Sequence, residues 1–283
     1  MQQFASGWKQ SYYGKGDVIV YRLNRDGRTK DNQSPVFGAN VMILVYGDAF
    51  WRTYTTGDNT ALIATNSMKN FIQRETLDFS GSDLEEYCRY LGTKFLDKYS
   101  QVEGLQVSAS EIPYTAFSGG SETFAPSGPE RLTARVELNR TGVVEISSGI
   151  RGFRMLRLGG SAFYGFVRDE YTTLPDIHNR PLHMWLDMEW LYTSPEAGFS
   201  AGKIPCTVRR IARQVFESFE SGSIQQIIYE AGTEMLEDIP EIAEIHLEAN
   251  NRTWDTVAER GEELGVYTDA RPPYGCLGLR LRR

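Results

Sequence analysis

Two similar stretches of the chain decide the fold: YLGTKFL at residues 90–96 and EAGTEML at residues 230–236. They belong to a longer match in which residues 90–114 align without a gap on residues 230–254. In both copies, apolar residues follow helical spacing and then the alternation typical of a strand. Similarity at a fixed offset indicates that one structural unit occurs twice, so we predict two related domains.

The aligned positions carry similar side chains in both copies. Four are identical, and these pairs are Gly92 with Gly232, Thr93 with Thr233, Leu96 with Leu236, and Ala109 with Ala249. Apolar residues also coincide along the predicted strand, where Val102, Leu105 and Val107 align with Ile242, Ile245 and Leu247. The same faces of the two copies are therefore expected to be buried.

The first half of the chain predicts strands and helices in the order strand, strand, helix, helix, strand, strand. In that order the segments are 18–21, 41–46, 67–78, 83–98, 104–109 and 131–138. The strand segments are rich in β-branched and aromatic residues, and the helical segments show apolar residues on one face. Residues 115–130, rich in Ser, Gly and Pro, are predicted to form a loop within this half.

The second half repeats this order of elements. Its segments are 142–168, 183–192, 205–218, 223–238, 243–249 and 275–282. Strands and helices that occur in runs, without strict alternation, favour an antiparallel sheet covered on one face by helices. We therefore predict an α+β protein with two tandem ββααββ domains, at residues 1–141 and 142–283.

Composition limits the kind of partner. The chain has 283 residues, of which 41% are hydrophobic and 24% charged, as is ordinary for a globular protein. Its formal charge of -7 provides no broad basic field, so nucleic acid and anionic membrane surfaces are not expected partners. No apolar run reaches the roughly 20 residues that a membrane-spanning helix needs.

Cysteine and histidine usage predicts neither a metal site nor a disulfide framework. The three cysteines and three histidines are Cys88, Cys206, Cys276, His178, His183 and His246, and none has the spacing of metal ligands. Free thiols fit a reducing compartment. The sequence shows neither a secretory signal nor a peroxisomal tripeptide, so we predict a cytoplasmic protein without a metal or cofactor.

Three further strings lie far apart along the chain. They are Tyr13-Gly14-Lys15, GDNTALIATNSMKN at residues 57–70, and FYGFVRDEYTTL at residues 163–174, which is followed by Arg180. In composition and order these strings resemble the urate oxidase (uricase) family. The resemblance implies two tandem tunnelling-fold domains and a homotetramer with active sites at subunit interfaces. It also implies cofactor-free oxidation of urate by dioxygen and water to 5-hydroxyisourate and hydrogen peroxide, in purine degradation.

The resemblance assigns residues to urate binding. A planar anion needs an aromatic face, a fork of donors and an amide for its edge. The family implies that Phe163 stacks on urate, Arg180 grips it bidentately and Gln225 pairs with its edge. Ile224 would donate its backbone N–H at the start of a predicted helix. Without the resemblance, the ordinary interpretations are favoured: Phe163 as a core residue, Arg180 as a solvated loop charge and Gln225 as an exposed helical residue.

The resemblance also assigns a proton relay to Lys15 and Thr65. A desolvated lysine near other cations can have its pKa lowered enough to act as a base. Asn66 would contact the substrate where the family usually has Asp. Without the resemblance, Lys15 is typical of a surface turn, and Thr65 or Asn66 is typical of a helix cap.

Asn250 would hold dioxygen or a catalytic water above the ring, although a turn asparagine is the ordinary alternative. Arg252 stands where many members of the family have His. Arginine does not deprotonate, so it would not act as a base, but it can stabilise developing peroxide charge.

Two other functions stay open at this point. The changes at Asn66 and Arg252 are compatible with a protein that binds urate without turnover. A pterin-type tunnelling-fold enzyme is the second alternative, although most such enzymes need zinc-ligating clusters of Cys and His, which this sequence does not provide.

Overall fold

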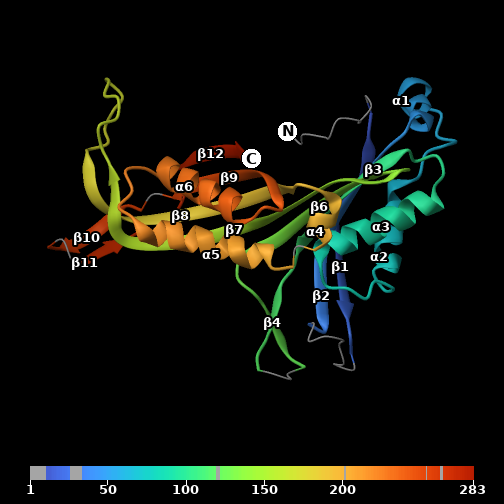
Figure 1. The fold of residues 1–283 in the computed structure, drawn as a ribbon, viewed down its shortest axis with the longest axis horizontal. Coiled ribbons are helices and arrows are strands. Elements are labelled where there is room, and N and C mark those ends of the chain that lie inside the picture. The colour runs from blue at the N-terminus through green and yellow to red at the C-terminus, as the bar shows by residue number, and fades with distance from the viewer. Residues whose placement is uncertain (1–10, 26–33, 119–121, 201, 253, 262–263) are drawn as a thin grey trace. The chain divides into compact units, whose positions relative to one another are not determined.

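The computed structural model describes residues 11–25, 34–118, 122–200, 202–252, 254–261 and 264–283 (Figure 1). In chain order its elements are β1 (Tyr13–Leu23), β2 (Val36–Tyr46), η2 (Asp48–Phe50), α1 (Trp51–Thr56), α2 (Thr65–Glu75), α3 (Leu84–Lys98), β3 (Gly104–Glu111), β4 (Tyr114–Ala116), β5 (Phe124–Pro126), β6 (Arg131–Asn139), β7 (Gly142–Phe163), β8 (Ile177–Tyr192), α4 (Pro195–Phe199), α5 (Ile204–Ser218), α6 (Ile224–Asp238), β9 (Ile242–Arg252), β10 (Thr256–Arg260), β11 (Leu264–Tyr267) and β12 (Tyr274–Arg282).

The chain forms two compact units. Unit 1 comprises Met1–Gly149 and Leu191–Gly202, and unit 2 comprises Ile150–Trp190 and Lys203–Arg283. The division falls within the long strand β7, and each unit contains antiparallel strands and helices. The predicted domain boundary after residue 141 stays a prediction.

In unit 1 the strands lie in the order β1, β2, β3, β6, and each neighbouring pair is antiparallel. Helix α2 contacts β1, and α3 contacts β3 and β6, so helices cover the sheet (Figure 1). Under them lie fully buried strand residues such as Val41, Ile43 and Val107. Their burial supplies most of the driving force for this unit, at roughly 25 cal/mol per Å² of apolar surface.

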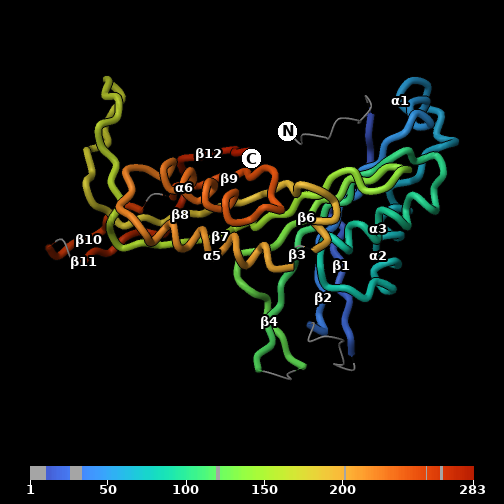
Figure 2. Tube along the Cα trace, in the orientation of Figure 1, coloured from blue at the N-terminus to red at the C-terminus, as the bar shows by residue number. Residues whose placement is uncertain are grey.

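In unit 2 the strands follow the order β7, β8, β9, β12, with β9 and β12 antiparallel. Helix α6 contacts β9 and β12, and α5 packs beside α6, as the chain trace in Figure 2 shows. On β9, Ile245, Leu247 and Ala249 are buried under α6. Because side chains alternate along a strand, Asn250 and Arg252 lie on the face of β9 opposite to α6, which none of the helices described in this unit covers.

The glycine pair of the internal repeat serves the same purpose in both units. A Cβ atom at Gly92 on α3 would overlap the side chain of Leu138 on β6. A Cβ atom at Gly232 on α6 would lie 2.9 Å from Leu281 Cδ1 and 3.1 Å from Leu247 Cδ1. Each helix therefore approaches its sheet closely at its glycine, which explains why the repeat has glycine at this position.

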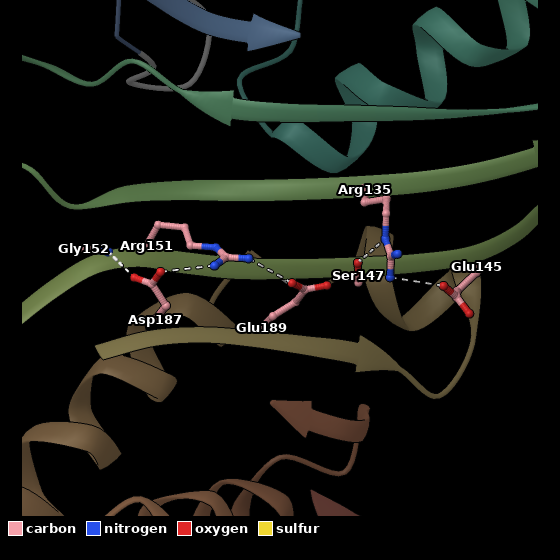
Figure 3. Close-up of polar contacts among 7 residues, drawn as sticks. All are labelled: Arg135, Glu145, Ser147, Arg151, Gly152, Asp187 and Glu189. Atoms are coloured by element: carbon pink, nitrogen blue, oxygen red, sulfur yellow. Dashed lines mark hydrogen bonds and ion pairs between the residues drawn. The ribbon is translucent and has the colours of Figure 1, made fainter. Parts of the chain in front are cut away.

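Polar contacts join neighbouring strands within each unit (Figure 3). In unit 2, Arg151 on β7 pairs with Asp187 and Glu189 on β8, at 3.1 and 3.2 Å. In unit 1, Arg135 on β6 donates to Ser147 Oγ on β7 at 3.0 Å and pairs with Glu145 at 3.3 Å. Such partly exposed pairs contribute about 0–1 kcal/mol each, so they act mainly by satisfying polar side chains at a fixed register.

Several predicted boundaries were wrong. The segment 115–130 is not wholly a loop, because β4 and β5 pair there as a two-stranded ribbon that projects from unit 1 (Figure 1). Strand β7 ends at Phe163, not at 168, and β8 begins at Ile177, not at 183. The ribbon of β10 and β11 was missed, because its short strands are mostly exposed and show no alternation of burial.

Candidate active site

In unit 2, the end of β7 lies beside the start of α6. Ser161 forms a parallel bridge with Ser221. The N–H of Ala162 donates to the carbonyl of Ser221 at 2.8 Å, and the N–H of Ser221 donates to that of Gly160 at 3.0 Å. Phe163 ends this part of β7, and α6 begins three residues after Ser221, so the backbone brings the two predicted substrate-binding segments together.

Phe163 and Arg180 lie next to each other. The Arg180 Cζ atom is 5.8 Å from the centroid of the Phe163 ring. The ring also stacks on Phe166, with centroids 5.0 Å apart and planes inclined by 14°. Close by, the N–H of Gly160 donates to Asn179 Oδ1 at 2.7 Å, which ties the start of β8 to β7. The structure therefore places an aromatic face and a guanidinium group together.

Arg180 is half-buried and forms no ion pair with any residue that the structure describes. Its Nε is buried and has no hydrogen-bond partner among the residues that the structure describes. Burial lowers the pKa of the guanidinium, which nevertheless stays charged near neutral pH. Burying a charge without a partner costs free energy, so this arrangement suits an anionic ligand.

The start of α6 offers backbone donors beside these side chains. Ser223 is the N-cap residue, and its Oγ accepts from the N–H of Gln226 at 3.2 Å. Gln226 Oε1 in turn accepts from the N–H of Gly222 at 3.0 Å. This cap leaves the N–H groups of Ile224 and Gln225 in the first turn, where a helix has no carbonyl partner for them and favours anions. The Ile224 side chain is buried, whereas that of Gln225 is exposed.

Asn250 and Arg252 share the helix-free face of β9. Asn250 pairs with Cys276 in the ladder of β9 and β12, so the alternative of a turn asparagine was wrong. Asn250 Oδ1 and Arg252 Nε are both buried and have no hydrogen-bond partner within the described part of the chain. Together with Arg180, three predicted site residues of unit 2 thus carry unsatisfied buried polar atoms, which is unusual in a folded protein.

In unit 1, one hydrogen bond joins the segments that carry Lys15 and Thr65. The N–H of Ile63 donates to the Tyr13 hydroxyl oxygen at 2.9 Å. Burial raises the pKa of that hydroxyl to about 12, so it is protonated near neutral pH. Tyr13 precedes Lys15 by two residues on β1, and Ile63 precedes Thr65 by two, at the start of α2. The bond therefore holds the start of α2 against the strand of Lys15.

Around Lys15, strand β1 approaches β2 closely and then forms a bulge. A Cβ atom at Gly14 would overlap the carbonyl oxygen of Ile43, so glycine is needed for β1 to approach β2 here. Directly after Lys15 the register with β2 shifts, and Asp17 in this bulge has a φ of 57°. Lys15 thus lies half-buried within a strand, and the alternative of a surface turn was wrong.

Helix α2 begins at Thr65 but is not capped by Thr65 or Asn66. Its N-cap residue is Ala64, whose carbonyl accepts from the N–H groups of Ser67 and Met68 at 2.8 and 3.2 Å. The expectation that Thr65 or Asn66 caps the helix was therefore wrong. Both side chains are exposed on the first turn, where they are available to a ligand.

Sequence reasoning missed the aromatic residues around Arg252. Its Cζ lies 4.3 Å from the ring centroids of both Trp185 and Tyr274. A signal was present for Trp185, because the apolar alternation of β8 places this tryptophan on the face away from the helices. Tyr274 gave no such signal, because it lies at the start of β12, outside the predicted strand 275–282.

The described residues contain neither a metal-binding cluster nor a membrane-spanning helix. No group of three or more His, Cys, Asp or Glu side chains in this part of the chain could hold a metal ion. Likewise, none of the helices described combines the length and hydropathy that crossing a bilayer requires.

These features define a class: an α+β protein with helix-covered antiparallel sheets, in which one unit carries a site suited to a planar anion. The Uricase family model matches residues 146–276. The chain is 36% identical to a uricase from Haloferax volcanii, over 87% of this chain and 89% of that protein. The crystal structure of a urate oxidase from Bacillus sp. TB-90 is 37% identical and superimposes with a TM-score of 0.85, covering 96% of this chain and 100% of that one. The chain belongs to the uricase family.

One relative is considerably longer than this chain. The chain is 38% identical to the uric acid degradation bifunctional protein of Bacillus sp. (strain TB-90), over 93% of this chain. The chain spans 58% of that relative's length, so it corresponds to one part of a larger protein there.

Proposed function

We propose that this protein is a cofactor-independent urate oxidase, which converts urate, dioxygen and water to 5-hydroxyisourate and hydrogen peroxide in purine degradation. The observation that carries the proposal is Arg180, whose buried Nε has no partner among the described residues and whose guanidinium lies 5.8 Å from Phe163. An aromatic face beside an uncompensated cation suits the planar urate anion. Family membership supports the same substrate.

Substrate binding is proposed to involve four groups of unit 2. Phe163 stacks on the heterocycle, and Arg180 donates to a carbonyl oxygen and the adjacent ring nitrogen. Gln225 pairs with the pyrimidine edge, and the Ile224 N–H adds a backbone donor from the first turn of α6. The uncapped N–H groups of that turn support this assignment.

Proton transfer is proposed to involve Lys15 and Thr65. Lys15 takes a proton from urate through the Thr65 hydroxyl or a bound water, and Asn66 contacts the substrate beside them. A positioned acid or base of this kind contributes about 10²–10⁴-fold to a rate. The hydrogen bond from Ile63 to Tyr13 supports the proposal, because it fixes the segment of Thr65 against the strand of Lys15.

The oxidation itself needs no electron carrier, because deprotonated urate is electron-rich. Two electrons pass from the ring to dioxygen, which forms a hydroperoxide at a ring carbon. Hydrogen peroxide then leaves, and a water molecule supplies the hydroxyl of 5-hydroxyisourate, so atoms and electrons balance. Asn250 would hold the dioxygen or water, and Arg252 would stabilise the peroxide charge.

The assembly is proposed from the resemblance and from the repeat. Residues 1–141 and 142–283 would be tandem tunnelling-fold domains of the ββααββ type, and the matching roles of Gly92 and Gly232 support their relationship. Subunits would form a homotetramer in which Lys15 and Thr65 of one subunit meet Phe163 of another. We further propose a cytoplasmic location, from the cysteine usage of the sequence.

Substituting Arg180 tests the proposal. Arg180→Gln removes the buried charge, so urate affinity should fall by about 10²-fold or more, as expected for a charge-assisted bidentate contact. Equilibrium binding of urate under nitrogen and turnover in air measure the two effects. Arg210→Gln is the matched control, because Arg210 is an exposed arginine paired with Asp238 on the helices of unit 2. Equal urate affinity in the Arg180 and Arg210 variants would contradict the proposed site.

A further inference from the structure

Arg252 is held between aromatic rings from two neighbouring strands. Its Cζ lies 4.3 Å from the ring centroid of Trp185 on β8 and 4.3 Å from that of Tyr274 on β12. Strand β9, which carries Arg252, lies between β8 and β12, and Tyr274 is its register partner. A ring from each neighbouring strand therefore contacts the guanidinium. We refer to Trp185 and Tyr274 as the aromatic clamp.

The guanidinium carbon lies over both rings, and a contact of this kind uses no N–H donor of the arginine. Ring stacking uses the planar faces of the group, whereas its N–H donors point outward in the plane. Among the described residues, Arg252 forms no ion pair, and its buried Nε has no hydrogen-bond partner. Arg151 in the same unit differs, because it pairs with Asp187 and Glu189. The charge of Arg252 is thus held in place without being neutralised.

An acceptor lies on the same face of the same strand. Asn250 shares the helix-free face of β9, about 6.6 Å along the strand from Arg252. Its Oδ1 is buried and has no partner in the part of the chain that is described. A charged donor next to an amide oxygen suits a small species with a negative oxygen and an O–H group. Hydroperoxide has this chemistry.

The clamp itself is fixed by further contacts. The Trp185 Nε1–H donates to His183 Nε2 at 3.3 Å, which sets the orientation of the indole. The Arg154 guanidinium also stacks on Trp185, with its Cζ 3.8 Å from the ring centroid. His183 in turn contacts the ring of Trp254, at 5.4 Å between centroids. Trp185 cannot turn away from Arg252 without losing these contacts.

We propose that Trp185 and Tyr274 are positioning residues that aim the N–H edge of Arg252 at the oxygen species bound beside Asn250. This inference rests on the proposed function. It gives Arg252, which does not act as a base, the task of stabilising negative charge on the bound oxygen species. The rings carry the effect, so the Tyr274 hydroxyl is not required.

A double-mutant cycle tests the clamp. Trp185→Leu and Tyr274→Leu are made in the wild-type chain and in Arg252→Gln, and the urate affinity, kcat and KM of each are measured. In the wild-type background, loss of either ring should lower kcat by about tenfold with little change in KM, given the usual strength of cation–π contacts. In Arg252→Gln the same substitutions should change kcat less than about twofold. Tyr274→Phe should recover most of the turnover that Tyr274→Leu loses.

Phe117→Leu, on an exposed aromatic residue of unit 1, is the control for the loss of a ring as such. If urate is oxidised but the leucine variants lose the same factor in both backgrounds, or Tyr274→Phe fails to recover turnover, the clamp is contradicted and the proposed function stands. If urate binds without turnover, the proposed function fails and the clamp, which rests on it, fails with it. A protein that neither binds nor oxidises urate would overturn both.

Discussion

At the scale of single residues, Arg180 and Lys15 have different tasks. Arg180 is proposed to provide a fixed charge for binding, whereas Lys15 is proposed to move a proton. Lys15→Met keeps the apolar part of the side chain but removes the amine. We expect kcat to fall by about 100-fold or more while urate affinity changes little.

Thr65→Ala should likewise lower kcat while urate affinity changes little, because the Thr65 hydroxyl would carry the proton to Lys15. Lys98→Met, on the exposed side of α3, is the control. Steady-state turnover and binding of urate under nitrogen provide the two readouts. Wild-type kcat in both the Lys15 and the Thr65 variants would remove the relay from the mechanism.

His183 makes stability depend on pH. Burial, and then the nearby charge of Arg154, lower its pKa, while Asp269 acts in the opposite direction. Above pH ~6.5 the histidine is neutral in both the folded and the unfolded chain and contributes nothing. Below that pH the unfolded chain takes up the proton first, so the free energy of unfolding falls as the pH drops, and the loss is complete only below the lower folded-state pKa.

The free energy of unfolding should therefore fall more steeply below pH ~6.5 in the wild type than in His183→Gln. Urea unfolding of both proteins at a series of pH values measures this difference. The groups around His183 that would respond to the substitution are Arg154, Trp185, Trp254 and Asp269. Parallel pH profiles for the two proteins would exclude the effect.

At the scale of elements, a substitution at the start of α6 should affect both the stability of the fold and the binding of urate. Ser223→Ala removes the N-cap and should cost about 1 kcal/mol of stability. Because the first turn also carries Ile224 and Gln225, we expect the KM for urate to rise as well. Ser194→Ala is the matched control, since Ser194 caps α4 through the N–H of Ala197 in the other unit. A Ser223 variant that loses stability with an unchanged KM would separate this cap from the site.

Helices and strands were predictable where the spacing of apolar residues matched one face of the element. Helix α3 buries Tyr87, Leu91 and Phe95 on one face, as its spacing indicated. Helix α6 spans Ile224–Asp238, where the sequence predicted a helix over residues 223–238. The ribbons β4–β5 and β10–β11 were not predictable, because short exposed strands form through backbone pairing and leave little trace in side-chain pattern.

The site was predictable only in part, for a related reason. Single residues such as Arg180 and Asn250 carried no signal without the family resemblance. Neither the unsatisfied buried Nε of Arg180 nor the rings around Arg252 can be read from a sequence, because both result from contacts between residues far apart in the chain. For Thr65, the sequence correctly indicated a helix start but not the cap at Ala64.

At the scale of the whole molecule, an active site shared between two subunits predicts how much turnover a mixture of two inactive variants recovers. If Lys15 comes from one subunit and Arg180 from another, Lys15→Met and Arg180→Gln are each inactive alone. In randomly mixed oligomers of the two variants, about one quarter of the sites would combine an intact Lys15 with an intact Arg180. Turnover of the co-expressed mixture should therefore recover to about one quarter of wild type. If each site lies within one chain, the mixture stays inactive.

The central claim is that the protein oxidises urate with no cofactor. The most direct measurement is the loss of urate's ultraviolet absorbance together with dioxygen uptake, using purified, chelator-treated protein without additions. We expect one dioxygen consumed and one hydrogen peroxide formed per urate lost. Urate that binds but is not consumed, or turnover that appears only after a metal or flavin is added, would contradict the claim.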